Sequence, residues 1–341
     1  LCMLSFLMIK FFLSNDKPVK QKYNKKFDIY GYGSIVLALA CMQIVLDKGQ
    51  QFNWFDTTWI CWLTGISVFS FVFFYVWELE YKYPVIDIRV FKDRNFMFGT
   101  LISSFINVML YSTLLLVPMF VQSLLGYSPS KSGLAMFPRA IICLIGLLVV
   151  GEISKYVKPK ILATIGLLTM GLSVLMLTQL NTTSSIESVV LPNILLCIGV
   201  PTAFVPITAM SFNTLPASKN ADAAALHALF KNIITAISTS MSATFIARVS
   251  QVRQTYLVEN LSPHNPMFQY KLMMLKSKFL IHYPSVLAAK KASGSLYKEL
   301  LQQAKLASFF DAFSVLAFLS VAVIPLLLLI KLKKQKNVTS T

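Results

Sequence analysis

Long apolar runs separated by short polar segments dominate this sequence. A helix needs about 20 apolar residues to cross roughly 30 Å of hydrocarbon. The alternating pattern of a membrane barrel strand is absent, and in lipid only a helix or a closed barrel pairs its whole backbone. We therefore predict eight complete membrane helices and the end of another. The predicted spans are 1–13 (the end of a helix), 32–46, 58–77, 97–124, 132–151, 160–179, 188–210, 223–247 and 307–330.

Composition agrees with this pattern. Hydrophobic residues make up 56% of the 341 positions and charged residues only 13%, against about a quarter charged in a soluble domain. The predicted fold class is all-α and integral to the membrane. The five cysteines lie in apolar runs without metal-ligand spacing, so we interpret them as small buried residues, and we expect no metal or cofactor. The chain starts with Leu1 inside an apolar run and shows no signal peptide, so we expect a preceding amino-terminal part.

The net charge of +17 does not indicate nucleic acid as a partner. Most Lys and Arg residues lie in short segments between the apolar runs, where they orient the helices and meet anionic lipid headgroups. No basic face with interleaved aromatic residues exists outside the spans. The partner that this charge predicts is the lipid membrane.

The distribution of basic residues also predicts which ends of the helices face the cytoplasm. The connections 14–30, 78–96, 152–160, 213–222 and 331–341 together carry 17 Lys and Arg. The connections on the other side, 47–57, 126–132 and 180–187, carry 2. The long segment 249–305 adds 8 to that side, but much of it lies far from the membrane ends, where the rule weakens. The basic set, including the carboxy-terminal tail, is predicted to be cytoplasmic.

The segment 249–305 is too long for a turn and too polar to span a membrane. Apolar residues recur at helical spacing over 268–281 and 284–305, which predicts two short amphipathic helices outside the membrane. The segment either folds over its own helices or forms a docking surface for a partner protein.

Several motifs occur in an order that indicates a family. The first group is Phe27-Asp28, Gly31, Gln43, Leu46-Asp47-Lys48-Gly49-Gln50 and Trp54-Phe55. The second is Trp77-Glu78, Pro84-Val85-Ile86-Asp87, Arg89, Phe91, Arg94-Asn95-Phe96 and Gly99. The remaining motifs are Gly126-Tyr127-Ser128, Gly133-Leu134, Pro138-Arg139, Pro206, Leu215-Pro216, Gln303-Ala304 and Asp311-Ala-Phe313. This order resembles the EmrB/QacA-type drug:proton antiporters, the 14-helix exporters of the major facilitator superfamily. The resemblance covers nearly the whole chain.

The resemblance implies a division of the chain. Residues 1–13 would end a preceding membrane helix and 14–30 would form a cytoplasmic loop. Residues 31–96 would hold the two helices that link the six-helix halves of such a transporter. Residues 97–331 would form the carboxy-terminal six-helix half, two three-helix units in inverted repeat, with the extracytoplasmic segment 249–305. Residues 332–341 would be a cytoplasmic tail.

The function implied is proton-coupled export of small amphipathic compounds, drugs included, by alternating access across the cell (inner) membrane. Protons and a small-molecule substrate would be the transported species. In a Gram-negative cell, the resemblance also implies an EmrA-like periplasmic adaptor and an outer-membrane channel as partners, with 249–305 as the natural contact. The proton-coupling acid and an arginine-bearing motif of the family belong to the amino-terminal half.

Two charged residues inside spans are candidates for coupling or substrate contact. Arg139 lies about five residues inside its span, where a charge costs about 2.5–3.5 kcal/mol and needs a partner or a wet cavity. Arg139 would contact an anionic substrate group or help to switch protonation. Alternatively, its side chain extends to the external headgroups. Asp311 lies early in the last span, where poor solvation would suit a group that binds and releases protons. The alternative for Asp311 is a helix cap or an ion pair with a neighbouring cation.

Further candidates lie on other helices. Lys231 stands where relatives often have arginine, so a bidentate contact is lost. Asp222 is interpreted as a charge at a helix amino terminus, and His227 as a packing residue or a pH sensor. Asn107 and Tyr111 lie four residues apart on one helix face and are the best candidates for lining a substrate cavity.

The segment Gly151-Glu-Ile-Ser-Lys155-Tyr-Val-Lys158-Pro-Lys160 resembles the gating loop of the superfamily. Relatives have an acid followed by arginine, which form a charge relay. Lys155 and Tyr156 occupy those places here. We expect Gly151, Glu152 and Lys155 to mark the loop without the relay, with lipid anchoring as its remaining role.

Two other classes of function are weighed against export. A truncated, non-transporting membrane scaffold is one alternative, because the coupling half is absent from this chain. A membrane-embedded acyl- or glycosyltransferase is the other, and Glu78 and Asp87 are its near candidates. No hydrolase triad, phosphate loop or metal-ligand set is visible, and Gly31-Tyr-Gly33 lacks the strand and helix context of a nucleotide site. The sequence therefore does not indicate an enzyme.

Overall fold

A computed structural model describes residues 28–81, 86–259 and 266–330 of the chain. Within these ranges, eight helices are long and apolar enough to cross a membrane. This confirms the predicted all-α membrane fold. The predicted helix end at 1–13, most of the loop 14–30 and the tail 332–341 lie outside the described residues.

The first two helices, α2 (Ile29–Lys48) and α3 (Thr58–Glu80), form a hairpin. Asp28 caps α2, because its Oδ1 accepts from the backbone N–H of Gly31 at 2.9 Å. Its Oδ2 accepts from Trp77 Nε1 at 2.9 Å, which joins the start of α2 to the end of α3. Near the middle, Ser67 Oγ donates to the carbonyl of Ala38 at 2.9 Å. Polar contacts therefore hold the two helices together at two levels.

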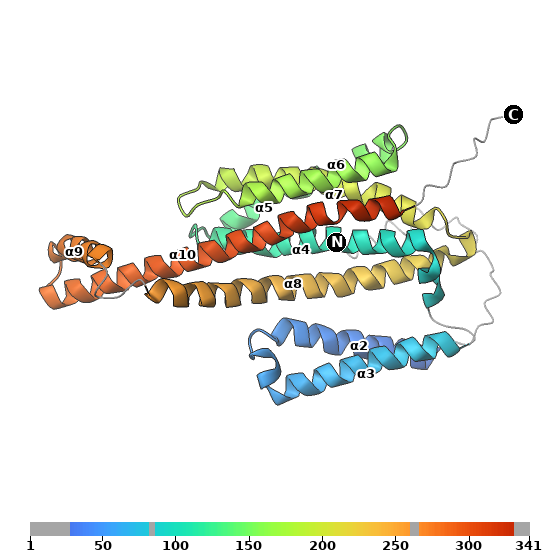
Figure 1. The fold of residues 1–341 in the computed structure, drawn as a ribbon, viewed down its shortest axis with the longest axis horizontal. Helices are drawn as coiled ribbons and strands as arrows, with labels where there is room; N and C mark the ends of the chain where they lie inside the picture. Colours follow the sequence, from blue (N-terminus) through green and yellow to red (C-terminus); the bar gives the residue numbers. More distant parts are fainter. Residues whose placement is uncertain (1–27, 82–85, 260–265, 331–341) are drawn as a thin grey trace.

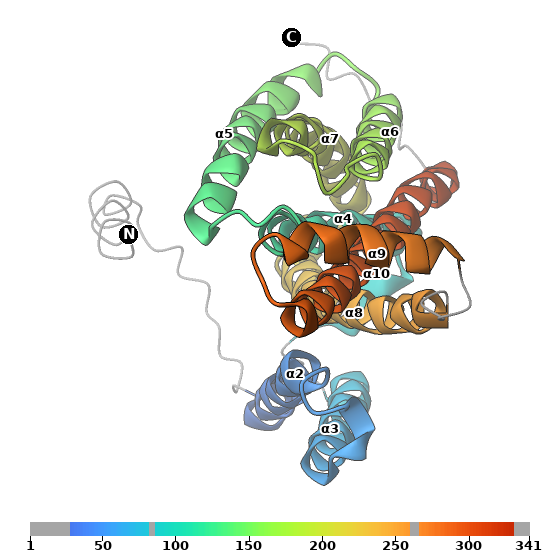
Figure 2. The same cartoon turned by 90° about the vertical axis from the view of Figure 1, so that its left-hand side faces the viewer.

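Six further long helices form the main bundle. They are α4 (Arg94–Ser123), α5 (Pro129–Ile153), α6 (Pro159–Leu177), α7 (Ile186–Phe212), α8 (Asn220–Glu259) and α10 (Ser285–Ala322). Seen end-on, α5, α6 and α7 gather on one side of α4, and α8 and α10 lie at its other side (Figure 2). The buried core joins α4, α6, α7 and α10, with Phe120 of α4 edge-on to Phe309 of α10.

Residue types at the helix ends explain where these helices begin. Asp93 caps α4 by accepting from the N–H of Phe96 at 2.9 Å, and it also accepts from Thr214 Oγ1, beyond the end of α7. Helix α5 has Pro129 at its first position, where the missing N–H costs nothing. Before it, Gly126 adopts φ of +72°, a left-handed conformation that favours glycine. These turns keep consecutive helices antiparallel.

Helices α6 and α7 pack especially closely. A side chain at Gly166 of α6 would meet the backbone N of Ala203 and lie 2.7 Å from the carbonyl carbon of Thr202. Gly199 of α7 approaches the backbone of α6 in the same way, near Gly166 and Met170. Two turns away, Ser173 Oγ donates to the carbonyl of Pro192 at 2.6 Å. Small residues that let backbones approach are the usual means of helix association in lipid.

We predicted two separate short helices in the segment 249–305, and the structure differs from this prediction. Helix α8 continues through it to Glu259, and α10 begins at Ser285 and runs unbroken into the last span. The short helix α9 (Pro266–Leu280) corresponds to the predicted 268–281. Helices α8 and α10 extend beyond the other helices, α10 reaches farther than α8, and α9 packs against the start of α10 (Figures 1 and 2). The polar stretch is therefore a helical extension and not a pair of independent helices.

The last apolar span ends at Leu329, close to the predicted 330, but it is not α-helical throughout. The α-helical part of α10 stops at Ala322, and a 3-10 helix, η4 (Ile324–Leu329), with Pro325 near its start, completes the apolar stretch. Proline cannot donate to the preceding turn, which accounts for the change in helix type.

The hairpin of α2 and α3 is set apart from the main bundle (Figure 1). Ser240 Oγ of α8 donates to the carbonyl of Leu46, near the end of α2, at 2.8 Å. At the other end of the hairpin, a 3-10 helix, η2 (Ile88–Lys92), leads from α3 into α4. The hairpin thus approaches α8 most closely through the carboxyl end of α2.

The close contact of α6 and α7 generates a prediction. Gly166→Ala places a methyl group against the backbone of α7, so the two helices must separate. We expect a loss of about 1–3 kcal/mol in the free energy of unfolding, measured by the loss of helical signal in detergent micelles. Gly133→Ala in α5 is the matched control, because nothing lies within 4 Å of its added carbon. Equal stability of the two variants would contradict the close packing.

Candidate functional site

Arg139 lies at a junction of three helices. Its guanidinium projects from α5 and is buried, with the residue 5% exposed. Nη1 donates to Asn193 Oδ1 of α7 at 3.3 Å. Nη2 donates to the carbonyl of Leu110 at 3.2 Å and to Thr113 Oγ1 at 3.4 Å, both on α4. The planar fork of arginine suits this arrangement, because it presents several donors in fixed directions.

The partners of Arg139 are neutral. No carboxylate lies within ion-pair distance of it in the part of the chain that the structure describes. Asn193 is itself held in place, because its Nδ2 donates to the carbonyl of Val189 at 2.7 Å. The side chain therefore stays between the helices rather than reaching outward to headgroups. Its positive charge is hydrogen-bonded but not neutralised by these partners.

Asp311 pairs with a cation on a neighbouring helix. Its Oδ2 accepts from Arg253 Nη2 of α8 at 2.8 Å. The side chains are 37% and 48% exposed, respectively. This geometry favours the ion-pair interpretation of Asp311. The pair joins α10 to α8 near the point where both helices leave the main bundle.

Asn107 and Tyr111 lie on α4, four residues apart. Asn107 is buried and donates through Nδ2 to the carbonyl of Ser103 at 2.8 Å, and Tyr111 is half-buried. A cavity of about 250 Å³ opens beside the adjacent face of α4, toward α8 and α10. Its walls are apolar apart from three serines, Ser112, Ser238 and Ser242. Ser242 Oγ donates to Ser112 Oγ at 2.8 Å, which links α8 to α4 at the cavity wall.

The loop between α5 and α6 contains the expected gating residues. Gly151 and Glu152 lie in the last turn of α5, and Lys155 Nζ donates to Glu152 Oε2 at 2.7 Å. Both side chains are largely exposed, so this is a local surface pair. A cleft of about 630 Å³ lies between the loop and the end of α7, and Lys155 and Lys158 line it.

Lys231 and His227 lie one turn apart on α8. Lys231 is half-buried, and its carbonyl accepts from Thr235 Oγ1 at 2.8 Å. The ring of His227 lies 6.2 Å from the rings of both Phe204 and Phe212 on α7. The position of His227 beside these rings favours its interpretation as a packing residue. Asp222 lies in the first turn of α8, as expected for a charge at a helix amino terminus.

Sequence reasoning missed three residues that complete these contacts. Asn193 and Thr113 bind Arg139, and Arg253 binds Asp311. Asn193 is a single amide in an apolar run, directly after Pro192, and a buried amide requires a partner. That requirement could have marked it as a candidate, although nothing in the sequence identifies Arg139 as its partner.

The exposure of the Asp311–Arg253 pair generates a prediction. A double-mutant cycle of Asp311→Asn and Arg253→Gln measures the coupling energy of the pair. We expect this energy to lie below about 1 kcal/mol, because water screens a half-exposed pair. Chemical unfolding in micelles measures it. A coupling energy of several kcal/mol would show that the pair is desolvated in the membrane-bound protein, contrary to this account.

Comparison with known proteins identifies the family. The profile described as Major Facilitator Superfamily matches residues 1–239. The chain is 26% identical over 247 residues to the multidrug export protein EmrB of Haemophilus influenzae, covering 72% of this chain and 48% of that protein. It is 28% identical over 249 residues to the probable multidrug resistance protein EmrY of Escherichia coli K12, covering 71% and 48%. It is 26% identical over 238 residues to the fatty acid resistance protein FarB of Neisseria gonorrhoeae, covering 70% and 47%.

The chain thus spans about half the length of these curated relatives. The family match covers α2 to α7 and the first half of α8, so it includes Arg139 and its three partners. Together with eight helices able to span a membrane, it establishes a multi-pass membrane protein. The chain belongs to the Major Facilitator Superfamily and is similar to its EmrB-type drug transporters.

Proposed function

We propose that this chain forms part of a proton-coupled exporter of small amphipathic compounds that works by alternating access. The observation that carries the proposal is the family match, because it covers 1–239 and its relatives are named for multidrug export. FarB is named for resistance to fatty acids, which are amphipathic anions. Mostly apolar cavities with a few polar groups suit such substrates. Export requires membrane helices that can move against one another, and the six-helix bundle supplies them.

The distribution of basic residues supports the orientation that we propose, and the resemblance to the EmrB/QacA-type family supports the division of the chain. Residues 14–30, the connection after α3, the α5–α6 loop and 332–341 would lie in the cytoplasm. The tip formed by α8, α9 and α10 would then lie on the outer side of the inner membrane. Helices α2 and α3 would be the linking pair, 1–13 the end of a preceding helix, and 97–331 the carboxy-terminal half.

Arg139 is the residue that we propose for coupling or substrate contact. Its cost of burial is offset by three neutral acceptors, so its charge stays available to an anionic group that enters during the cycle. Such a group is either the substrate or a carboxylate of the other transporter half. Because the guanidinium binds α4 and α7 together, movement of either helix would change its environment.

The tip of the molecule supports a contact with a periplasmic adaptor, which would lead to an outer-membrane channel. Helix α9 has no buried residue. Met267, Tyr270, Met273 and Met274 are each at least 64% exposed. Positions 267, 270 and 274 follow helical spacing, so they present one apolar face. Exposed methionine and aromatic side chains are enriched where proteins dock.

The partial coverage of the relatives leaves one alternative open. A chain that covers about half of its relatives is either part of a transporter or a non-transporting membrane scaffold. Transport by the complete protein that carries this chain separates the two functions.

The role of Arg139 is tested by two substitutions. Arg139→Met removes the charge, and Arg139→Lys keeps it without the fork. In everted membrane vesicles holding the complete protein, we expect proton-driven dye efflux to fall to background with Met and to be partly retained with Lys. The stability of both variants should fall by about 1–3 kcal/mol, because buried acceptors lose their donors.

The controls separate charge from packing. Lys131→Met removes an exposed cation near the same end of α5 and should leave efflux unchanged. Asp311→Asn should also retain efflux, as expected for the ion-pair interpretation. Loss of efflux in Asp311→Asn but not in Arg253→Gln would instead assign proton coupling to Asp311. Equal efflux in Arg139→Met and the unmodified protein would remove Arg139 from the mechanism.

The adaptor contact is tested on α9. Tyr270→Asp with Met274→Asp places two charges on its apolar face and should abolish co-purification with the adaptor, because desolvating them is costly. Lys276→Asp is the control, because it lies on the opposite face of α9 and changes the net charge by the same amount, and it should keep the complex. Co-purification that survives the first pair would refute the contact.

A further inference from the structure

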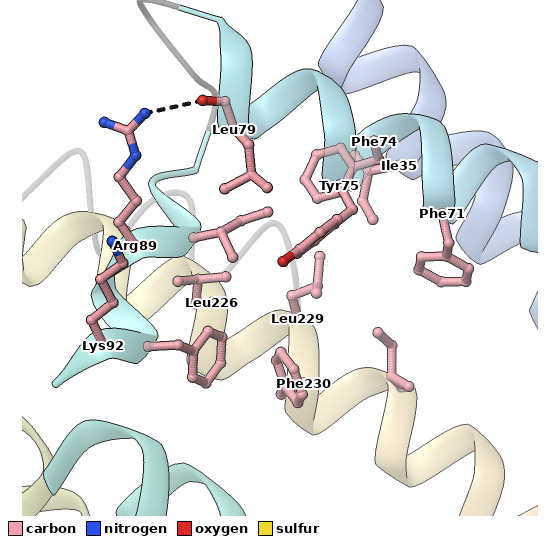
Figure 3. A pocket seen from close by; sticks show the side chains of 13 residues that line it. Ile35, Phe71, Phe74, Tyr75, Leu79, Arg89, Lys92, Leu226, Leu229 and Phe230 are labelled. Atoms are coloured by element: carbon pink, nitrogen blue, oxygen red, sulfur yellow. Dashed lines mark hydrogen bonds between the residues drawn. The ribbon is translucent and has the colours of Figure 1, made fainter. Parts of the chain in front are cut away.

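A cleft separates the hairpin from the main bundle at the end near η2. It has a volume of about 600 Å³ and opens between α3 on one side and α8 on the other. Figure 3 shows the side chains of Phe74, Tyr75 and Leu79 facing those of Leu226, Leu229 and Phe230. Helix η2 closes one end of the cleft, and its residues Arg89 and Lys92 belong to the lining. The cleft therefore has long apolar walls and a basic end.

The geometry of η2 places the two basic side chains together. In a 3-10 helix, side chains three residues apart eclipse one another, so Arg89 and Lys92 project from the same face. Asp87 fixes the start of this helix, because its Oδ1 accepts from the N–H of Arg89 at 3.0 Å. The two side chains lie along one edge of the cleft (Figure 3).

Neither cation is neutralised within the described part of the chain. Arg89 Nη2 donates to the carbonyl of Leu79 at 3.0 Å, and no carboxylate lies within 4.0 Å of Arg89 or Lys92 there. The neighbouring acids have other partners: Asp87 Oδ2 pairs with Lys219 at 3.2 Å, and Asp93 Oδ1 accepts from Phe96 and Thr214. Both basic side chains are exposed, so an anion can reach them.

The apolar walls of the cleft are stable only when apolar groups cover them. Helix α2 of the hairpin contacts α8 through Leu46 and Ser240, which lie about ten residues from the cleft along these two helices. The hairpin and the main bundle therefore diverge toward η2. In a bilayer, hydrocarbon chains fill such a wedge, since water there would leave apolar walls unsolvated. Helix η2 follows the end of α3, which is long and apolar enough to cross a membrane.

We propose that this cleft binds one acidic phospholipid. An acyl chain lies between α3 and α8, and the headgroup phosphate contacts Arg89 and Lys92. Guanidinium and ammonium groups are the side chains that bind phosphate. The lipid must carry a net negative charge, because the cation of a zwitterionic headgroup competes with Arg89 and Lys92 for the phosphate. The lipid would tie the hairpin to the bundle without belonging to the transport pathway.

The proposal is tested by lipid retention. The complete protein is purified from bilayers of equal phosphatidylglycerol and phosphatidylethanolamine, and the lipid that remains bound is measured by native mass spectrometry. We expect one phosphatidylglycerol per chain to resist delipidation. Arg89→Gln with Lys92→Gln should weaken its retention roughly thirtyfold. This factor corresponds to the attraction of about 1 kcal/mol that each basic side chain contributes near an anionic lipid surface.

Two matched variants distinguish a built site from general attraction. Lys48→Gln with Lys131→Gln removes the same charge from exposed positions at the ends of α2 and α5 and should leave the tightly bound lipid in place. Ile233→Trp narrows the cleft without changing charge and should also release the lipid. Equal retention of phosphatidylethanolamine, equal loss in the Lys48 and Lys131 control, or full retention in the Arg89 and Lys92 variant would each overturn the proposal. Efflux measured in parallel separates failure of this site from failure of the proposed function.

Discussion

Hydrocarbon as the surrounding solvent is the constraint on which this structure depends. A helix in lipid satisfies its own backbone, but apolar side chains gain little by leaving lipid for another helix. Association must then come from close packing and from polar groups. Helices α6 and α7 use Gly166 and Gly199 to approach, and Ser173 binds the carbonyl of Pro192. Helices α4, α5 and α7 meet at Arg139, and α8 meets α4 through Ser242 and Ser112.

The same constraint gives different parts of the molecule different roles. Arg139 is buried, and its neutral partners hold it without cancelling its charge, which suits a group that responds to a passing anion. Asp311 and Arg253 are half-exposed near the point where α8 and α10 leave the main bundle, and they join these two helices. The hairpin has fewer polar links to the bundle, and the basic residues on η2 lie where a lipid can complete the contact. The residue proposed for coupling and the proposed lipid site thus lie in separate regions.

Hydropathy predicted the spans because a membrane helix must carry a continuous apolar run. It did not predict the continuity of α8 and α10 beyond the membrane. Polarity marks where lipid ends, whereas a helix ends only where its backbone is capped or broken. Residues 285–305 are rich in Ala, Lys, Leu and Gln, which are good helix formers, and contain no proline. The helix therefore starts after Pro284 and continues into the span. The partners of Arg139 were not predictable, since Asn193 lies 54 residues away and only tertiary packing brings it close.

The central claim is that the eight helices cross the membrane with the basic connections on the cytoplasmic side and α9 outside. Labelling of single cysteines in intact cells tests it most directly, with the five native cysteines of the chain replaced. The account predicts that a cysteine at Ser277 in α9 reacts with a membrane-impermeant reagent and that one at Tyr156 in the α5–α6 loop reacts only after the cells are opened. Labelling of Tyr156→Cys from outside, with Ser277→Cys protected, would contradict it.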